Sequence, residues 1–227
     1  MFLVDTNFFK TGIIMRNQTK QYLLSGLFIL LLGIMPAFQV MAEGLLPPQQ
    51  VIQSISEQLQ NKLKDKAFTR NFAQVTEYVR GVIDPHTDFD KIAPLVLGKH
   101  WKTATNQEQE RFKTEFQTLL IRTYSRAFIE YNDWTIRYLP PEPSSDPAKI
   151  IVKTVVEQPR INPIDIKYRM FLSKGEWKVY DIMIEGVSLV TNYRSTFSED
   201  IQRKGSLSVV IDELAKRNVE ALAAKGS

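Results

Sequence analysis

The sequence predicts an α+β fold in which helices come first, a curved antiparallel sheet of four to five strands follows, and two helices close the chain. Apolar residues recur at helical spacing between residues 47 and 131. From Trp134 the pattern changes to the two-residue alternation of strands, and near residues 185–188 it changes back to helical spacing. A chain that completes a set of helices before its strands begin is typical of α+β domains.

Two helices are expected at the start of the domain. The first follows Pro47 and Pro48, and its apolar residues return every fourth position as far as Leu63. This spacing places an apolar stripe along one side of a helix. The second covers residues 70–83 and ends at Asp84, because the residue before a proline disfavours helical backbone.

Two further helices are expected before the strands. Asp88 can cap a short helix that Gly98 ends. The longest helix follows Thr105, which forms a capping-box pairing with Glu108, and it runs to Tyr131. Its aromatic stripe is wider than one neighbouring helix would cover. We therefore expect a sheet or a ligand against it.

Four strands are expected, at residues 134–139, 149–157, 164–172 and 176–185. Proline and glycine turns separate them, and such short connections favour antiparallel neighbours. Simple alternation divides the last strand into two faces. One face holds Lys178, Tyr180, Ile182 and Ile184, and the other holds Trp177, Val179, Asp181 and Met183.

The last strand is expected to turn directly into a helix. Gly186 permits a sharp turn, and Ser188 can cap a helix over residues 189–204. Gly205 separates this helix from a final one. The sheet and the long helix could together enclose an apolar cavity, as in the cone-shaped NTF2-like folds.

Residues 1–42 have the features of an export signal. Arg16 and Lys20 precede an apolar run, and Ala42 is the small residue of an expected cleavage site before Glu43. These features predict a protein of the periplasm.

Two alternatives concern this segment. Met15 is a possible true start, which would leave residues 1–14 upstream of the protein. An uncleaved membrane anchor is the other alternative, but the apolar run is shorter than the roughly 20 residues that a spanning helix needs, and Pro36 interrupts it. The remaining residues, 43–227, are expected to form one domain.

Composition excludes several classes of function. The formal net charge is +4, without a dense basic block, so nucleic acid is not an expected partner. The chain contains no cysteine, which excludes a disulfide, a thiol nucleophile and a lipidated cysteine within it. It also lacks the sequence motifs of serine hydrolases, P-loop proteins, dinucleotide-binding proteins and zinc proteases. No catalytic residue and no metal ligand is therefore assigned.

A few polar residues still allow two interpretations. His86 and His100 lie in separate predicted loops, which favours ordinary surface or capping roles over metal or acid–base chemistry. Asp181 and Glu185 could form a carboxylate pair, but a solvated strand face or salt bridges with the neighbouring strand are favoured. The candidate partners are Lys167 and Arg169. Lys99, Lys102, Arg122 and Arg126 could meet anionic headgroups or partner proteins, although a solvated helix face is favoured.

The chain resembles the MlaC family, also called toluene-tolerance auxiliary proteins, from about Val51 to Ala221. The resemblance is carried by the segments WKVYDI (177–182), IEGVSLV (184–190) and NYRSTF (192–197). DFDKIA (88–93), VLGKHW (96–101) and the series Phe112, Phe116, Leu120, Tyr124 stand in the family's order.

This resemblance implies a periplasmic, non-enzymatic phospholipid carrier that maintains the lipid asymmetry of the outer membrane. Its implied partners are a phospholipid, a lipoprotein–porin complex of the outer membrane, and an ABC transporter of the inner membrane that carries an MCE-domain ring. The implied carrier is a monomer and needs no cofactor beyond its lipid cargo. Two acyl chains hold on the order of 30 methylenes, and their exposure to water would cost about 25 kcal/mol, so a deep apolar cavity is required.

The expected walls of the cavity are apolar residues on faces that could meet. They are Phe116, Leu120, Tyr124, Ile151, Val155, Tyr168, Tyr180, Ile182, Ile184, Val190 and Tyr193. Two alternatives share these residues. An NTF2-like enzyme for a small molecule would need polar groups inside the cavity. A periplasmic adaptor or chaperone would instead have a solid core and no enclosed cavity.

Overall fold

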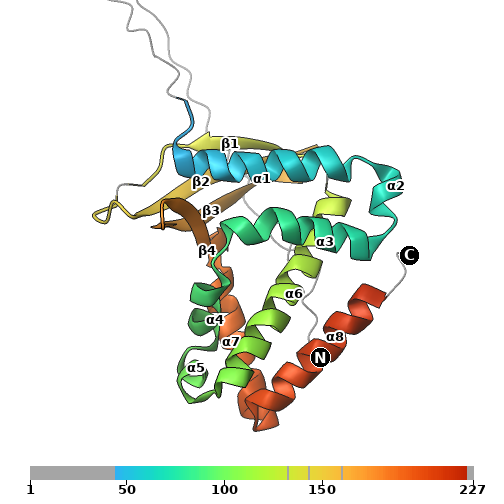
Figure 1. Ribbon diagram of the computed structural model, residues 1–227. Helices are drawn as coiled ribbons and strands as arrows, with labels where there is room; N and C mark the ends of the chain where they lie inside the picture. Colours follow the sequence, from blue (N-terminus) through green and yellow to red (C-terminus); the bar gives the residue numbers. More distant parts are fainter. Residues whose placement is uncertain (1–43, 132, 143, 160, 224–227) are drawn as a thin grey trace, which may run out of the picture. The chain divides into compact units, whose positions relative to one another are not determined.

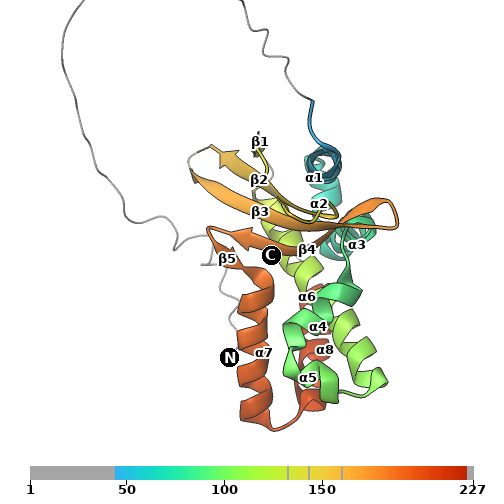
Figure 2. The same ribbon diagram turned by 90° about the vertical axis from the view of Figure 1, so that its left-hand side faces the viewer.

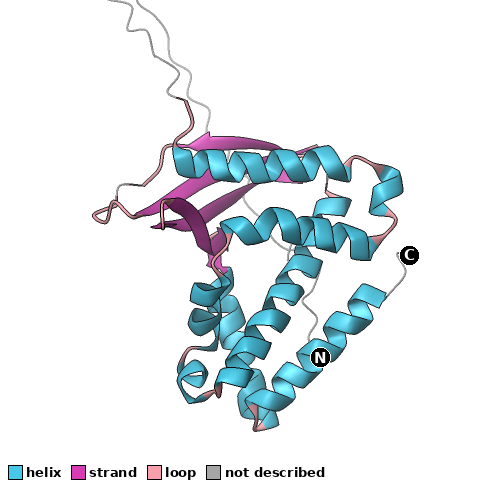
Figure 3. Cartoon of the chain, in the orientation of Figure 1, coloured by secondary structure: helices cyan, strands magenta, loops and turns pink. Residues whose placement is uncertain are grey.

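The computed structural model describes residues 44–131, 133–142, 144–159 and 161–223. The expected export signal and its cleavage site lie outside this part of the chain. Within it the predicted α+β order is confirmed, with helices before and after one antiparallel sheet (Figure 1, Figure 3).

In the described part of the chain, eight α-helices and one 3-10 turn precede or follow the sheet. Before the sheet come α1 (Pro47–Leu63), α2 (Lys66–Thr69), α3 (Phe72–Ile83), η3 (Asp84–His86), α4 (Phe89–Leu97), α5 (Lys99–Thr103) and α6 (Asn106–Glu130). After the sheet come α7 (Leu189–Lys204) and α8 (Leu207–Ala223). The capping box of Thr105 and Glu108 and the cap at Asp88 are confirmed. The short helices α2 and α5 were not expected, because a single turn carries no periodicity.

The sheet has five strands in sequence order, each antiparallel to its neighbour. They are β1 (Thr135–Leu139), β2 (Lys149–Gln158), β3 (Ile161–Ser173), β4 (Glu176–Ile184) and β5 (Val187–Ser188). Lys174 and Gly175 form the two-residue turn between β3 and β4, both with positive φ. Glu185 and Gly186 do the same between β4 and β5. Such turns match the twist of antiparallel strands.

A β-bulge at Tyr180 changes the expected faces of β4. Arg169 pairs with Asp181 and Met170 pairs with Val179, so Tyr180 is an extra residue on β4. Tyr168 pairs with Ile182, and Tyr168 and Met170 share a face of β3. Ile182 therefore shares a face with Val179. The expected strict alternation is wrong across Tyr180, because a bulge adds one residue to one strand only.

The inner face of the sheet is the face on which Val152, Tyr168, Met170, Val179 and Ile182 lie. Ile52 of α1 packs with Val152, Met170 and Val179 in one buried cluster. A second cluster joins α1, α3 and α6 to the ends of β1 and β2. A third, purely helical cluster joins α4, α6, α7 and α8. Figure 2 shows α7 leaving the sheet directly after β5 and running beside α4 and α6.

Helix α1 also hydrogen-bonds the edge strand β1. The Gln49 side chain donates to the carbonyl of Leu139 at 3.2 Å, and the Gln60 side chain donates to the carbonyl of Trp134. The Trp134 indole in turn donates to Ser56 Oγ at 2.8 Å. Side chains of α1 thus occupy backbone acceptors at both ends of β1.

Two glycines of this fold are expected to respond to alanine in opposite directions. Gly205 ends α7 at φ 75°, where an L side chain is strained, so Gly205→Ala should lower the free energy of unfolding by about 1 kcal/mol. Gly81 lies within α3 with no atom within 4 Å of an added Cβ. Gly81→Ala should therefore raise it by about 0.5–1 kcal/mol. Urea denaturation of both variants measures these changes, and two changes of the same sign would contradict the assignment.

Candidate functional site

The structure brings the expected wall residues of α6 and α7 together. The rings of Phe116 and Tyr193 meet edge to face, with centroids 5.2 Å apart. Val190 lies in the same helical cluster, and Leu120 packs against it. Tyr124 follows Leu120 by four residues on α6, so the two side chains are neighbours on one helix face. These five residues therefore form one contiguous surface between the two helices.

Three of the expected strand residues lie on the inner face of the sheet. Tyr168 and Ile182 are cross-strand partners, and both pack against the cluster that contains Ile52. Ile184 pairs with Ile166 on the same face and is buried. These side chains share the inner face with Val152 and Thr154 of β2.

Ile151 and Val155 lie on the opposite face of the sheet. Ile151 pairs with Arg169 and Val155 pairs with Asp165, whereas Val152 pairs with Tyr168. Because side chains alternate along a strand, a wall that contains Tyr168 includes Val152 and not its neighbour. Val152 was missed because the sequence alone does not determine register.

The bulge also separates Tyr180 from Ile182. The Tyr180 ring lies 5.8 Å from that of Phe171, and the Lys91 ammonium lies over both rings. Tyr180 also packs against the helical cluster. It therefore contacts α4 and the end of β3 instead of continuing the row of Ile182 and Ile184.

The tyrosines of this region lie in low-dielectric surroundings. Burial raises the pKa of Tyr168 to about 12 and that of Tyr193 to about 12. Burial also raises the pKa of Tyr124. Tyr193 is buried, but Tyr124 and Tyr168 are only half-buried and keep accessible surface. Both hydroxyls therefore stay protonated at neutral pH.

Asp181 and Glu185 do not form a carboxylate pair. Asp181 is buried and accepts hydrogen bonds from Arg169 at 3.1 Å, from Ser188 Oγ at 2.8 Å and from the backbone N–H of Val190 at 3.2 Å. It thereby fixes the start of α7 to β4. Glu185 is exposed. The favoured salt bridge is confirmed for Arg169.

Lys167 and His86, two further candidates from the sequence, do not form part of a catalytic or metal-binding group in the described part of the chain. Lys167 pairs with Glu142 at 3.2 Å and not with Asp181. Burial lowers the pKa of His86, and the charge of Lys178 acts in the same direction. Across the described ranges, no three His, Cys, Asp or Glu side chains come close enough together to hold a metal ion. Over the same ranges, no helix has the length and apolar character needed to cross a membrane.

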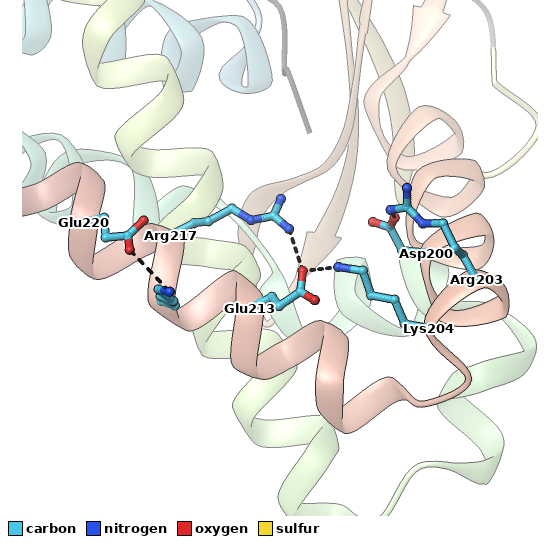
Figure 4. A network of polar contacts seen from close by, with 7 residues as sticks. Asp200, Arg203, Lys204, Glu213, Arg217 and Glu220 are labelled. Carbon is cyan, nitrogen blue, oxygen red and sulfur yellow. Dashed lines mark hydrogen bonds and ion pairs between the residues drawn. The ribbon is translucent and has the colours of Figure 1, made fainter. Parts of the chain in front are cut away.

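A polar network joins α7 to α8. Glu213 of α8 binds Lys204 at the end of α7 and Arg217 one turn further along α8 (Figure 4). Asp200 is buried and binds Arg203 on α7. Of these contacts, the Lys204–Glu213 ion pair joins the two helices at their shared turn, next to Gly205.

The sequence matches the family model described as MlaC protein over residues 53–216. The chain belongs to the MlaC family. This match runs from within α1 to within α8 and confirms the resemblance carried by the segments around β4 and α7. The α6 and α7 surface and the inner sheet face are thus features of an MlaC domain.

Curated relatives and a solved structure agree with the family. Toluene tolerance protein ttg2D of Pseudomonas putida is 25% identical over 180 residues, which cover 78% of this chain and 83% of that protein. The intermembrane phospholipid transport system binding protein MlaC of Haemophilus influenzae is 27% identical over 115 residues, covering 49% of this chain and 54% of the relative. A phospholipid-binding protein of Ralstonia solanacearum, solved in complex with a phospholipid, is similar with a TM-score of 0.70 and 27% identity. That likeness covers 78% of this chain and 99% of the solved one.

Proposed function

We propose that this protein is a periplasmic carrier that binds a phospholipid and transports it between the outer and inner membranes. The observation that carries the proposal is the likeness to a family member solved with a phospholipid, which extends over 99% of that chain. The transport name of the Haemophilus influenzae relative supports the same function. Maintenance of outer-membrane lipid asymmetry is the physiological role that follows.

The acyl chains are proposed to lie between the inner face of the sheet and the surface of α6 and α7. Tyr124 and Tyr168 support this placement, because these half-buried side chains lie on the α6 and α7 surface and on the inner face of the sheet, and both keep surface that a ligand can cover. The inner-face residues Ile166 and Ile182 are likewise only half-buried. Enclosure here would remove the acyl chains from water, which is the main energetic need of an aqueous crossing.

No chemical step is proposed for the bound lipid. Asp181, a buried acid near this region, accepts hydrogen bonds from Arg169, from Ser188 and from the backbone N–H of Val190 at the start of α7. A carrier needs only to bind and release its cargo. The proposed exchange partners are the lipoprotein–porin complex of the outer membrane and the MCE-domain ABC transporter of the inner membrane, with the carrier acting as a monomer after removal of residues 1–42.

Native mass spectrometry of protein released from the periplasm by osmotic shock tests this proposal. We expect a mass increase of one diacyl phospholipid on most molecules, and a phospholipid in the extract. The control is the same protein after removal of lipid, which should regain the mass increase on incubation with phospholipid vesicles. Protein that carries no lipid after gentle release, and gains none from vesicles, would contradict the function and favour a solid-cored adaptor or chaperone.

A further inference from the structure

Arg122 on α6 is more buried than the other basic residues that were considered as candidates for binding anionic headgroups or partner proteins. Lys99, Lys102 and Arg126 are exposed. Arg122 is half-buried, and its Nε donates a hydrogen bond to Oδ1 of Asn218 on α8 at 2.7 Å. The expectation of a solvated helix face therefore does not hold for Arg122.

Two other arginines of α6 and α8 form ion pairs with carboxylates. Arg111 forms an ion pair with Asp212 at 2.6 Å, and Arg217 forms one with Glu213 at 2.9 Å. In contrast, no carboxylate lies within ion-pair distance of Arg122 in the part of the chain that the structure describes. Its partner is a neutral amide.

Asn218 of α8 hydrogen-bonds both Arg122 and Glu115 of α6. The Asn218 amide donates to the Glu115 carboxylate at 2.7 Å and to the Glu115 carbonyl at 2.9 Å, while its oxygen accepts from Arg122. Asn218 is itself buried. The Glu115 carboxylate therefore accepts from the Asn218 amide. Of the Arg122 nitrogens, only Nε donates a hydrogen bond to a described residue, so the terminal nitrogens can donate to another acceptor.

The surroundings of Arg122 favour an anion as that acceptor. Burial is the main cause that lowers the pKa of the Arg122 guanidinium; Tyr193 acts in the opposite direction, and the positive charges of Arg126 and Arg217 lower the pKa to a smaller extent. An arginine nevertheless remains protonated at neutral pH. A partly desolvated cation among other cations is stabilised by a bound anion, and a planar guanidinium offers two parallel donors to a phosphate.

We propose that the terminal nitrogens of Arg122 bind a phosphate group at the border of the α6 and α7 surface. Arg122 lies on α6 two residues from Leu120 and two residues from Tyr124, both of which belong to that surface. The source of the phosphate rests on the proposed function: in a phospholipid carrier it is the phosphodiester of the bound lipid. The acyl chains would then lie along the apolar residues of α6 and α7, and the headgroup beside α8.

The test compares Arg122→Gln with Arg111→Gln, which removes a guanidinium from the same helix pair but from an exposed ion pair. Lipid-free protein is incubated with vesicles that contain equal amounts of phosphatidylglycerol and diacylglycerol, and native mass spectrometry measures which lipid is retained. We expect the wild type and Arg111→Gln to prefer phosphatidylglycerol. Arg122→Gln should lose about tenfold to a hundredfold of that preference, the range for a hydrogen bond to a charged group. An unchanged preference in Arg122→Gln overturns the inference.

Two further measurements distinguish a failure of this inference from a failure of the proposed function and from misfolding of the variant. If the wild type retains neither lipid, the proposed function fails, and calorimetric titration with inorganic phosphate decides the site. Binding that Arg122→Gln abolishes supports a site for free phosphate, and no binding overturns the site. Thermal melting checks folding, and if Arg122→Gln does not fold, Arg122→Met, which keeps the apolar stem, is compared by the same criterion.

Discussion

Leu120→Trp is expected to remove most of the bound phospholipid while leaving the melting temperature of the lipid-free protein nearly unchanged. Leu120 is half-buried on α6 and packs beside the helical cluster, where the acyl chains are proposed to lie. An indole there would occupy space that acyl chain otherwise fills. Lipid extraction and thermal melting of the lipid-free protein measure the two effects.

Ile121→Trp is the matched control on the next residue of the same helix. Ile121 is only 2% exposed and lies in the cluster that joins α6 to α1, α3 and the sheet. Overpacking of such a close-packed core costs about 1–3 kcal/mol, which should lower the melting temperature visibly. If Leu120→Trp is as destabilised as Ile121→Trp and still carries lipid, the acyl chains do not lie against α6.

Asp181→Ala is expected to lower the free energy of unfolding by about 3 kcal/mol. The substitution removes the acceptor of Arg169, Ser188 and the Val190 N–H at once, and removal of one partner from a buried charge pair costs about 3–5 kcal/mol. The lower end applies because the Arg169 side chain is 39% exposed and water can solvate it. Urea denaturation measures the change.

Glu185→Ala is the control for this substitution, because Glu185 is an exposed carboxylate four residues along the same chain segment. Its loss should change the free energy of unfolding by about 0.5 kcal/mol or less. Lipid retention at low temperature, where both variants are folded, should stay within a few-fold of the wild type. A folded Asp181→Ala protein without lipid would show that Asp181 acts in binding as well as in folding.

Local chemistry made much of the fold predictable. Caps at Asp88, Thr105 and Ser188 predicted helix starts that the structure confirms, since such caps depend only on residues within one turn. The turns at Gly175 and Gly186 were predictable for the same reason. The bulge at Tyr180 was not, because an extra residue in one strand depends on how the neighbouring strand pairs with it.

The candidate site was predictable only in part. The contiguous residues of α6 and α7 follow from helical periodicity, which predicts a face without knowledge of its neighbours. Ile151 and Val155 were selected by apolar character, although pairing with β3 turns Val152 toward Tyr168 instead. The hydrogen bond between Arg122 and Asn218 was also not predicted, because the two residues are 96 positions apart in the sequence.

The glutamines of α1 limit how other proteins can bind this MlaC-family chain. Partners often bind a sheet by adding a strand to its edge through backbone hydrogen bonds. Gln49 and Gln60 already hydrogen-bond the carbonyls of Leu139 in β1 and of Trp134 just before it, so an incoming strand would compete with these side chains for both acceptors. At the other edge, β5 contains only two residues and is too short to template a strand. Strand addition is therefore disfavoured at both edges of the sheet, and recognition through side chains is the expected alternative.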